Sequence, residues 1–301
     1  RMTDISHVHT NLVRATCFQL QLYQSIVAKT FKNGKSCYCR FSFSCDCLLL
    51  AVLITRLGKK INEWRVWGMI AVLIGPLALL VTMNNLSSGI IICGIAFVMM
   101  FIACKRKWPF IATVALGITV IVFAPPVAIA LEKAGILHSY QLSRILVWKN
   151  PEAYPKSGGY QVLQGLYAIG SGGLLGKGLG QSIQKLSFLP EPQNDMIFAV
   201  ICEELGLFGA VAVIFMFLFM LYRFLVIAGN APDLFGAMIV TGVLAHIAIQ
   251  VVLNIAVVTN VIPNTGITLP FISYGGTSVL FLMVEMGMVL SVSNRIRLEQ
   301  Q

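Results

Sequence analysis

Charged side chains are scarce in this sequence, and their scarcity excludes most classes of soluble protein. Only 11% of the 301 residues are charged, whereas 57% are hydrophobic. An average soluble domain has about 25% charged residues, so this chain cannot cover a water-exposed surface. Disordered chains are poor in apolar residues, so the composition also excludes extensive disorder. The balance predicts an integral membrane protein.

The sequence also lacks a basic run with interleaved aromatic residues, which is the usual sign of a nucleic-acid-binding surface. Its net charge is nevertheless +10 at pH 7, from 22 Lys and Arg against 12 Asp and Glu. In a membrane protein such an excess is typical of basic cytoplasmic loops. We therefore predict no nucleic-acid partner.

Strong metal and nucleotide motifs are missing as well. Two C-x-C pairs lie near the N-terminus (Cys37, Cys39, Cys45 and Cys47), but zinc sites usually have C-x₂₋₄-C spacing. The run GLLGKGLG at 173–180 fails the P-loop pattern because Gly178, not Ser or Thr, follows Lys177. Its glycines instead predict tight turns or a close approach to a ligand.

Uncharged apolar stretches long enough to cross a membrane recur along the chain, since a spanning helix takes about 20 apolar residues. Six clear candidates and a weaker one, which contains Asp46, are 66–83, 86–104, 110–131, 206–222, 235–259, 269–292 and 41–55. The predicted fold is therefore an all-α polytopic transmembrane helical bundle of about seven spans.

The segments between these spans alternate in charge. Residues 56–65, 105–107 and the C-terminal end are basic, whereas 84–88 and 260–268 carry no charge. The positive-inside rule places the basic segments and the C-terminus in the cytoplasm. Residues 132–205 then form a large outer loop. Within it, 160–170 predicts a short amphipathic helix at the outer membrane surface, and 171–194 predicts loop.

Two carboxylates in the outer loop are candidates for chemistry. Asp195 directly precedes the apolar run MIFAVICEELG, so it could cap a helix, whose dipole would hold the carboxylate ionised. An ionised carboxylate at a membrane–water boundary also suits a general base or a divalent cation, and these roles are compatible with a cap. Glu191, four residues earlier, could share either role.

Other charged residues nearby have two interpretations. Glu203 and Glu204 stand within the apolar run and need partners, such as Lys185 or Arg144, which favours a structural role. Lys177 and Lys185 could instead contact phosphate groups of a lipid carrier or lipid headgroups.

The last two spans contain polar residues that need explanation. His246, Gln250 and Asn254 recur every four residues and form a stripe on one helix face. Glu285 is an intramembrane acid, which should face the bundle interior or a cavity. Interhelical hydrogen bonding is the favoured interpretation, and a proton relay is the alternative. The run PFISYGGTS at 270–278 permits close packing or lines a cavity that opens outward.

Two long runs resemble a known family. They are GGYQVLQGLYAIGSGGLLGKGLGQSIQKLSFLPEPQNDMIFAVICEELGLFGA at 158–210 and IPNTGITLPFISYGGTSVL at 262–280. Both resemble signatures of the SEDS family of FtsW/RodA/SpoVE proteins, and YQLSRILVWKNPE at 140–152 fits the segment before them. The resemblance extends over about 56–297 and is strongest to the FtsW branch.

The resemblance implies a ten-helix membrane fold, of which the seven spans would be the last seven. It implies a peptidoglycan glycosyltransferase that polymerises lipid II at the outer face of the bacterial plasma membrane. The implied partners are a class B penicillin-binding protein and other divisome or elongasome membrane proteins.

The resemblance also implies roles for individual residues. The family's essential loop aspartate falls on Asp195 and the glutamate of its Pro-Glu motif on Glu191, with a divalent cation (Mg²⁺ or Mn²⁺) for which both are candidate ligands. Further residues are predicted to contact the substrate: Arg144, Lys177, Lys185, Ser273, Tyr274, Gly275 and Gly276.

The N-terminal part departs from the family. A Gln-Pro-Ser-Glu motif is expected near 21–29, where the chain reads QLYQSIVAK, and MNNLSSG at 83–89 replaces a Gln-Pro-Asp-Leu-Gly segment. We predict an atypical segment at 1–47, truncated or frame-altered, in which three helices and a secretory signal peptide are missing. A SEDS-like transmembrane domain is predicted over 48–301.

The implied reaction inverts the sugar centre, because lipid II is α-linked to its pyrophosphate and the polymer is β-1,4-linked. Asp195 is expected to take the proton of the acceptor hydroxyl, or to hold a metal beside it. The alternatives are a lipid II flippase and a non-catalytic scaffold for a class B penicillin-binding protein.

Overall fold

A computed structural model of the chain describes residues 36–84, 86–117, 119, 123, 140–154 and 158–299. Every regular element within these residues is a helix. The predictions for residues 1–35, and for most of the proline-interrupted stretch that ends at 131, lie outside the described residues.

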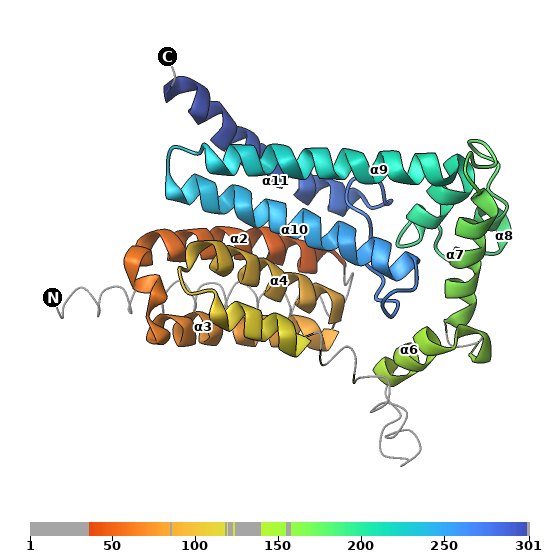
Figure 1. Cartoon of the computed structure of the whole chain (residues 1–301), viewed down its shortest axis with the longest axis horizontal. Coiled ribbons are helices and arrows are strands. Elements are labelled where there is room, and N and C mark those ends of the chain that lie inside the picture. Colours follow the sequence, from red (N-terminus) through yellow and green to blue (C-terminus); the bar gives the residue numbers. More distant parts are fainter. Residues whose placement is uncertain are drawn as a thin grey trace, which may run out of the picture.

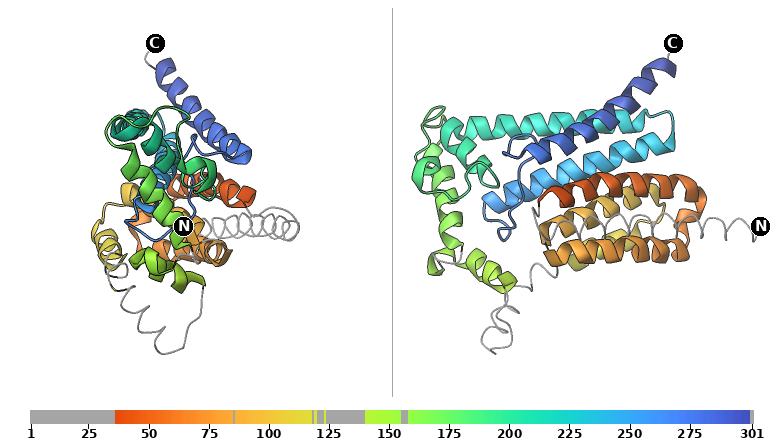
Figure 2. Two further views of the ribbon diagram at one scale, coloured as in Figure 1. Left: turned by 90° about the vertical axis from the view of Figure 1, so that its right-hand side faces the viewer. Right: turned by 180° about the vertical axis from the view of Figure 1, so that it is seen from behind.

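Most of the long helices lie side by side in one bundle (Figure 1). They are α2 (Ser36–Leu57), α3 (Trp64–Asn84), α4 (Leu86–Ala103), α9 (Ile197–Gly229) and α10 (Leu234–Val258). A 3₁₀ turn, η1 (Gly58–Asn62), joins α2 to α3, and α11 (Gly276–Glu299) crosses the bundle obliquely (Figure 2). The prediction of an all-α bundle is confirmed.

Helix α10 lies at the centre of the bundle, and buried residues occur on all its sides, as expected of a predominantly apolar helix. It packs against α2, α4, α9 and α11. Its residues divide between two apolar clusters: Met238 and Ala245 belong to the one formed with α2, α3 and α4, whereas Val243 and Ile247 belong to the one formed with α9 and α11. The helix therefore joins the two halves of the bundle.

Three of the described helices are long and apolar enough to cross a membrane: Ile197–Gly229, Leu234–Val258 and Gly276–Ile296. Shorter apolar helices lie at Val66–Pro76, Ser87–Ala103 and Trp108–Gly117, each of which overlaps a predicted span. The protein is thus a membrane protein, while the number of seven spans stays a prediction. The last span begins at Gly276 rather than at 269, because 269–275 is an irregular loop.

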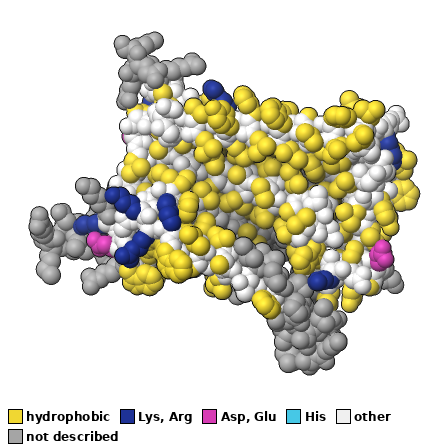
Figure 3. Space-filling model, viewed as in Figure 1, with side chains coloured by type: hydrophobic (Ala, Val, Ile, Leu, Met, Phe, Trp, Pro, Cys, Tyr) yellow, Lys and Arg dark blue, Asp and Glu magenta, His cyan; other side chains and the backbone are white. Residues whose placement is uncertain are grey.

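The surface in Figure 3 agrees with a membrane environment. Apolar side chains cover the side of the bundle in this view, while Lys and Arg gather at one end, around the α2–α3 connection. Residues far apart in the sequence meet there, since Lys105 N donates to Asn62 Oδ1 at 3.0 Å. The basic loops at 56–65 and 105–107 therefore share one end of the bundle.

The segment predicted as an outer loop contains helices at the opposite end. These are α6 (Tyr140–Lys149), η2 (Pro151–Ala153), α7 (Gly159–Gly172) and α8 (Gln184–Ser187). Helix α7 runs across the end of the bundle (Figure 1), and the predicted helix at 160–170 is confirmed. The prediction that 171–194 is entirely loop is wrong, because α8 forms a short turn within it.

A glycine-rich segment, residues 172–180, here called the collar, packs against the N-terminal part of α9. The backbone of α9 breaks at Gly206, where φ is 66°, and Leu207 N donates to Gly173 O at 3.0 Å. A Cβ at Gly172 would lie 2.0 Å from Cys202 O, and one at Gly176 would lie 2.2 Å from Glu204 O. Gly172 and Gly176 thus allow the collar to approach the backbone of α9 closely. The close approach predicted for these glycines is to a helix of the same chain.

Candidate functional site

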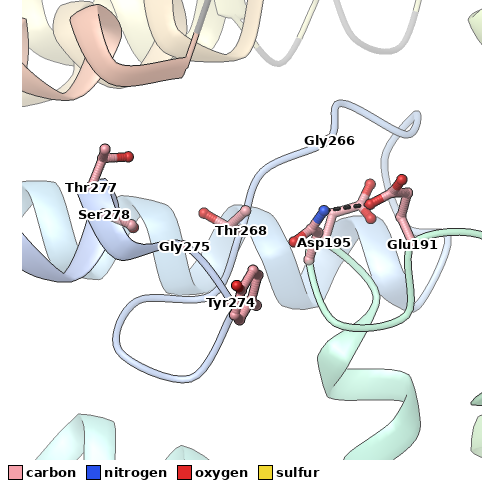
Figure 4. A pocket seen from close by; sticks show the side chains of 9 residues that line it. Glu191, Asp195, Gly266, Thr268, Tyr274, Gly275, Thr277 and Ser278 are labelled. Atoms are coloured by element: carbon pink, nitrogen blue, oxygen red, sulfur yellow. Dashed lines mark hydrogen bonds between the residues drawn. The ribbon is translucent and has the colours of Figure 1, made fainter. Parts of the chain in front are cut away.

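A cavity of about 420 Å³ opens at the end of the bundle that holds the predicted outer loop. Two regions far apart in the sequence surround it (Figure 4): the turn before α9, and the α10–α11 loop together with the start of α11. The lining residues are Glu191, Asn194, Asp195, Gly266, Thr268, Tyr274, Gly275, Thr277 and Ser278. The structure therefore brings together Asp195, Glu191, Tyr274 and Gly275 from the residues that the sequence predicts.

Asp195 lies in the turn before α9 and does not cap that helix. The N-cap residue is Met196, which makes no side-chain capping bond, and α9 begins at Ile197. The capping interpretation of Asp195 is therefore wrong. Its carboxylate lines the cavity instead, where it is available for chemistry.

The position of Asp195 is set by contacts with two other helices. Asn254 of α10 is fully buried, and its Nδ2 donates to Asp195 O at 2.9 Å and to Ile267 O at 2.6 Å. Gln161 of α7 donates from Nε2 to Asp195 Oδ1 at 3.4 Å. These contacts span 59 and 34 residues of sequence, so only the packed bundle can form them.

The surroundings raise the pKa of Asp195 above its ordinary value of 3.8. Burial is the main cause, because a charged form loses its hydration there, and the negative charge of Glu191 adds to it. A hydrogen bond from its own backbone, the bond from Gln161 and the positive charge of Arg144 act in the opposite direction. A carboxyl group with a raised pKa is a stronger base than an ordinary aspartate.

Glu191 faces the same cavity from an unusual backbone conformation. Its φ is 52°, in the left-handed region that residues other than glycine seldom adopt. Asn194 Nδ2 donates to its Oε2, as the dashed line in Figure 4 shows. The side chain stays exposed, so Glu191 is open to a ligand.

The predicted residues at the start of α11 have different roles. Ser273 is buried and donates to Asn194 O at 2.6 Å, while its oxygen accepts a bond from Leu269 N at 2.7 Å. It thereby ties the α10–α11 loop to the turn that contains Asp195. Tyr274 N donates to Gln193 O at 2.9 Å, and the exposed phenol lies at the cavity. Gly276 opens α11 but does not line the cavity.

Lys177 and Lys185 lie outside the cavity lining and pair with glutamates of α9. Lys177 Nζ is 2.7 Å from Oε1 of the fully buried Glu203, and Lys185 Nζ is 2.8 Å from Glu204 Oε1. Ser182 Oγ also donates to Glu203 at 2.5 Å. The predicted structural role of the two glutamates is confirmed, whereas phosphate contact by the lysines stays a prediction.

The polar stripe on α10 anchors neighbouring segments. His246 Nδ1 lies 2.9 Å from Glu285 Oε2 on α11, and Gln250 Nε2 donates to Thr268 O at 2.9 Å. With Asn254, the stripe holds α11, the cavity wall and the Asp195 turn. The favoured interpretation, hydrogen bonding between elements, is confirmed.

Several cavity residues escaped the sequence reasoning. Thr277 and Ser278 lie in the run at 270–278, for which a cavity lining was one of the two predictions. Asn194, Gly266 and Thr268 were not singled out, although they belong to the two runs that carry the family resemblance. Their membership in those runs was the available signal. It could not show which residues of the runs face the cavity, because that depends on how the two loops pack together.

The donor chemistry of the cavity suits a hard divalent cation. Asp195 and Glu191 supply carboxylate oxygens, and Asn194, Thr268 and Ser278 bring amide and hydroxyl oxygens to the same lining. The described part of the chain has no group of three or more His, Cys, Asp and Glu that could hold a metal. Mg²⁺ is commonly bound by one or two carboxylates together with other oxygen ligands, so a cation at Asp195 and Glu191 stays a prediction.

Comparisons with known proteins agree with this architecture. A family model described as cell cycle protein, for FtsW, RodA and SpoVE, matches residues 44–298. The stage V sporulation protein E of Bacillus subtilis is 40% identical over 252 residues, which are 82% of this chain and 66% of that protein. The probable peptidoglycan glycosyltransferase FtsW of Coxiella burnetii is 37% identical over 225 residues, 73% of this chain and 58% of that protein. The chain belongs to the FtsW/RodA/SpoVE family.

A solved structure is similar over most of the chain. Its title describes structural coordination of polymerization and crosslinking by a peptidoglycan synthase complex. The TM-score is 0.64 at 26% sequence identity, with 84% of this chain and 69% of that chain covered. This chain spans about two thirds or less of the length of the curated relatives described above.

Proposed function

We propose that this protein is a peptidoglycan glycosyltransferase that polymerises lipid II into glycan strands. The observation that carries the proposal is Asp195, a half-buried carboxyl group with a raised pKa in a cavity at the predicted outer end of the bundle. The name of the Coxiella burnetii relative, a probable peptidoglycan glycosyltransferase, supports the same activity.

The geometry supports a mechanism in which Asp195 acts as the base. The acceptor's 4-hydroxyl gives its proton to the Asp195 carboxylate as its oxygen attacks the anomeric carbon of the donor sugar. The bond from that carbon to the pyrophosphate breaks with inversion, and the pyrophosphate leaves with its electron pair. Burial supports the proton transfer because it raises the pKa of the accepting carboxyl group.

The other end of the cavity suits the departing pyrophosphate. The first hydrogen bond of α11 runs from Val279 N to Gly275 O. The backbone N–H groups that precede Val279 in this helix therefore have no intrahelical acceptor. A helix N-terminus favours negative charge, and the hydroxyls of Thr277 and Ser278 stand beside it. Arg144 adds positive charge near Asp195. In the alternative role, in which Asp195 is a metal ligand instead of the base, it would hold a divalent cation together with Glu191, and that cation would supply positive charge to the cavity.

The sidedness and partners of the chain belong to the same proposal. Basic residues gather at the end of the bundle opposite the cavity, which favours a cytoplasmic C-terminus and a cavity on the outer face of the bacterial plasma membrane. The similar solved structure is that of a peptidoglycan synthase complex that coordinates polymerization and crosslinking. We therefore include a class B penicillin-binding protein as the partner that crosslinks the new strands.

The experiment that tests the proposal compares the wild-type chain with Asp195→Asn. Each is purified with the cognate transpeptidase and given labelled lipid II and Mg²⁺, and glycan strands are separated by length. We expect strands from the wild type and none from the variant, because an amide cannot take the proton. A fully active variant would refute the role of Asp195. Transfer of lipid II across vesicles without strand formation would favour a flippase instead, and neither activity would favour a scaffold.

A further inference from the structure

The main chain of Asp195 is fixed independently of its carboxylate. Asn254 donates to Asp195 O and to Ile267 O from one fully buried amide group. It thereby joins the turn before α9 to the loop that forms the facing cavity wall. Because this contact is made to the backbone, it does not restrain rotation of the Asp195 carboxylate about its side-chain bonds.

A chain of three hydrogen bonds restrains that rotation. Gly266 N donates to Asn264 Oδ1 at 3.0 Å, and Asn264 Nδ2 donates to Gln161 Oε1 at 3.4 Å. Gln161 Nε2 then donates to Asp195 Oδ1 at 3.4 Å. Each side-chain amide in this series accepts at its oxygen and donates from its nitrogen. The donation from Asn264 therefore fixes which end of the Gln161 amide faces Asp195.

The two oxygens of the Asp195 carboxylate have different surroundings. Oδ1 accepts a hydrogen bond from Gln161. Oδ2 lies toward Gly266, since a Cβ atom placed on Gly266 would be 3.9 Å from Oδ2. Gly266 itself lines the cavity. A base acts only within hydrogen-bond reach of the proton that it takes, and a displacement of about 1 Å can cost roughly a hundredfold in rate.

We infer that Gln161, oriented by Asn264, is a positioning residue that holds the Asp195 carboxylate in its reactive orientation. The inference rests on the proposed function, since it assigns the support of the proposed base. Gln161 touches no reacting atom in this scheme and acts only through Asp195. Replacing it should therefore slow the chemical step without weakening substrate binding.

The kinetic test compares Gln161→Met with Gln164→Met on the same helix. Initial polymerisation rates are measured against lipid II concentration, with Asp195→Asn as the inactive reference. We expect Gln161→Met to lower kcat by about tenfold or more at an unchanged KM, because its side chain has similar length but no donor. Asn264→Ala should lower kcat less, and the double variant should be no slower than Gln161→Met, because both residues act along one path.

A second readout does not depend on activity. The infrared difference between the wild type and Asp195→Asn isolates the carboxylate band of Asp195. Losing the Gln161 donor should shift this band, while Gln164→Met leaves it in place. Thermal unfolding in detergent shows that each variant is folded.

The outcomes separate this inference from the proposed function. An unmoved band in Gln161→Met, an unchanged kcat, or an equal effect of Gln164→Met would overturn the positioning role. Strand formation by Asp195→Asn would instead refute the proposed base, and the infrared band would still decide whether Gln161 orients the carboxylate.

Discussion

At the scale of single residues, Asp195 shows how opposing contacts set the chemistry of one carboxyl group. Burial and the charge of Glu191 raise its pKa, while Gln161 and Arg144 favour the ionised form. The same contacts determine where the carboxylate points, through Gln161, and where its backbone lies, through Asn254. The residue is thus positioned by neighbours that are distant in sequence, whereas burial and the nearby Glu191 make it more basic.

The raised pKa predicts the pH dependence of polymerisation. Only the ionised carboxylate accepts the proton, so the rate should rise with pH through the pKa of Asp195, at a pH above 3.8. Glu191→Gln removes a charge that raises this pKa, so it should move the acidic limb to lower pH. Initial rates measured across a pH series check this. If the acidic limb of the pH–rate profile moved to higher pH in Glu191→Gln, the assignment of Asp195 as the titrating base would be contradicted.

The stability of Asp195→Asn provides the control for that series. A folded-state pKa raised above the unfolded value contributes stability below the unfolded pKa, and this contribution is lost as the pH rises through the folded pKa. The neutral Asn side chain avoids the cost of burying the charge. The melting temperature of Asp195→Asn at neutral pH should therefore equal or exceed that of the wild type, so lost activity would not reflect unfolding.

At the scale of elements, the collar and α9 behave as one unit. Backbone bonds join Gly173 O to Leu207 N and Glu203 O to Lys177 N, each at 3.0 Å. The Lys177–Glu203 ion pair locks the same two segments together, with the glutamate fully buried. None of the collar residues lines the cavity.

The break in α9 predicts a sharp difference between two glycine substitutions. Gly206 has φ of 66°, and a Cβ there would lie 2.4 Å from Gly176 N. Gly206→Ala should therefore destabilise the fold by more than about 2 kcal/mol. Gly170 in α7 has open space around it, so Gly170→Ala should be neutral or stabilise by up to about 1 kcal/mol. Thermal unfolding in detergent measures both, and equal effects would contradict the account.

At the scale of the whole molecule, the cavity and the largest group of Lys and Arg side chains in Figure 3 lie at opposite ends of the helix bundle. The cavity lies where α7 crosses the bundle, and Lys and Arg gather around the α2–α3 connection (Figures 1 and 3). Apolar side chains cover the length between them. This separation is the arrangement expected of a protein that does its chemistry on one side of a membrane.

The proposed sidedness predicts which positions a membrane-impermeant thiol reagent reaches in intact cells. Leu175 in the collar is 81% exposed, so Leu175→Cys should add labelling above the level of the parent chain. Arg106→Cys, at the basic end, should add labelling only after the membrane is permeabilised. The parent's own cysteines provide a common baseline for both variants. The reverse pattern would invert the proposed orientation.

The sequence alone determined the properties that depend on local pattern and composition. Low charge with long apolar runs required a membrane protein, and the polar stripe of His246, Gln250 and Asn254 followed from helical spacing. The family runs selected Asp195 and Glu191 before any geometry was known. These inferences succeed because side-chain polarity and helix periodicity are read within a few turns of chain.

Only the tertiary structure decided how the site is assembled. It paired Lys177 and Lys185 with Glu203 and Glu204 outside the cavity, and it moved the start of α9 past Asp195. It brought Gln161 and Asn254 to Asp195 across 34 and 59 residues of sequence. Donors and acceptors this far apart meet only when helices pack, because hydrogen bonds need separations of about 3 Å that no sequence spacing specifies.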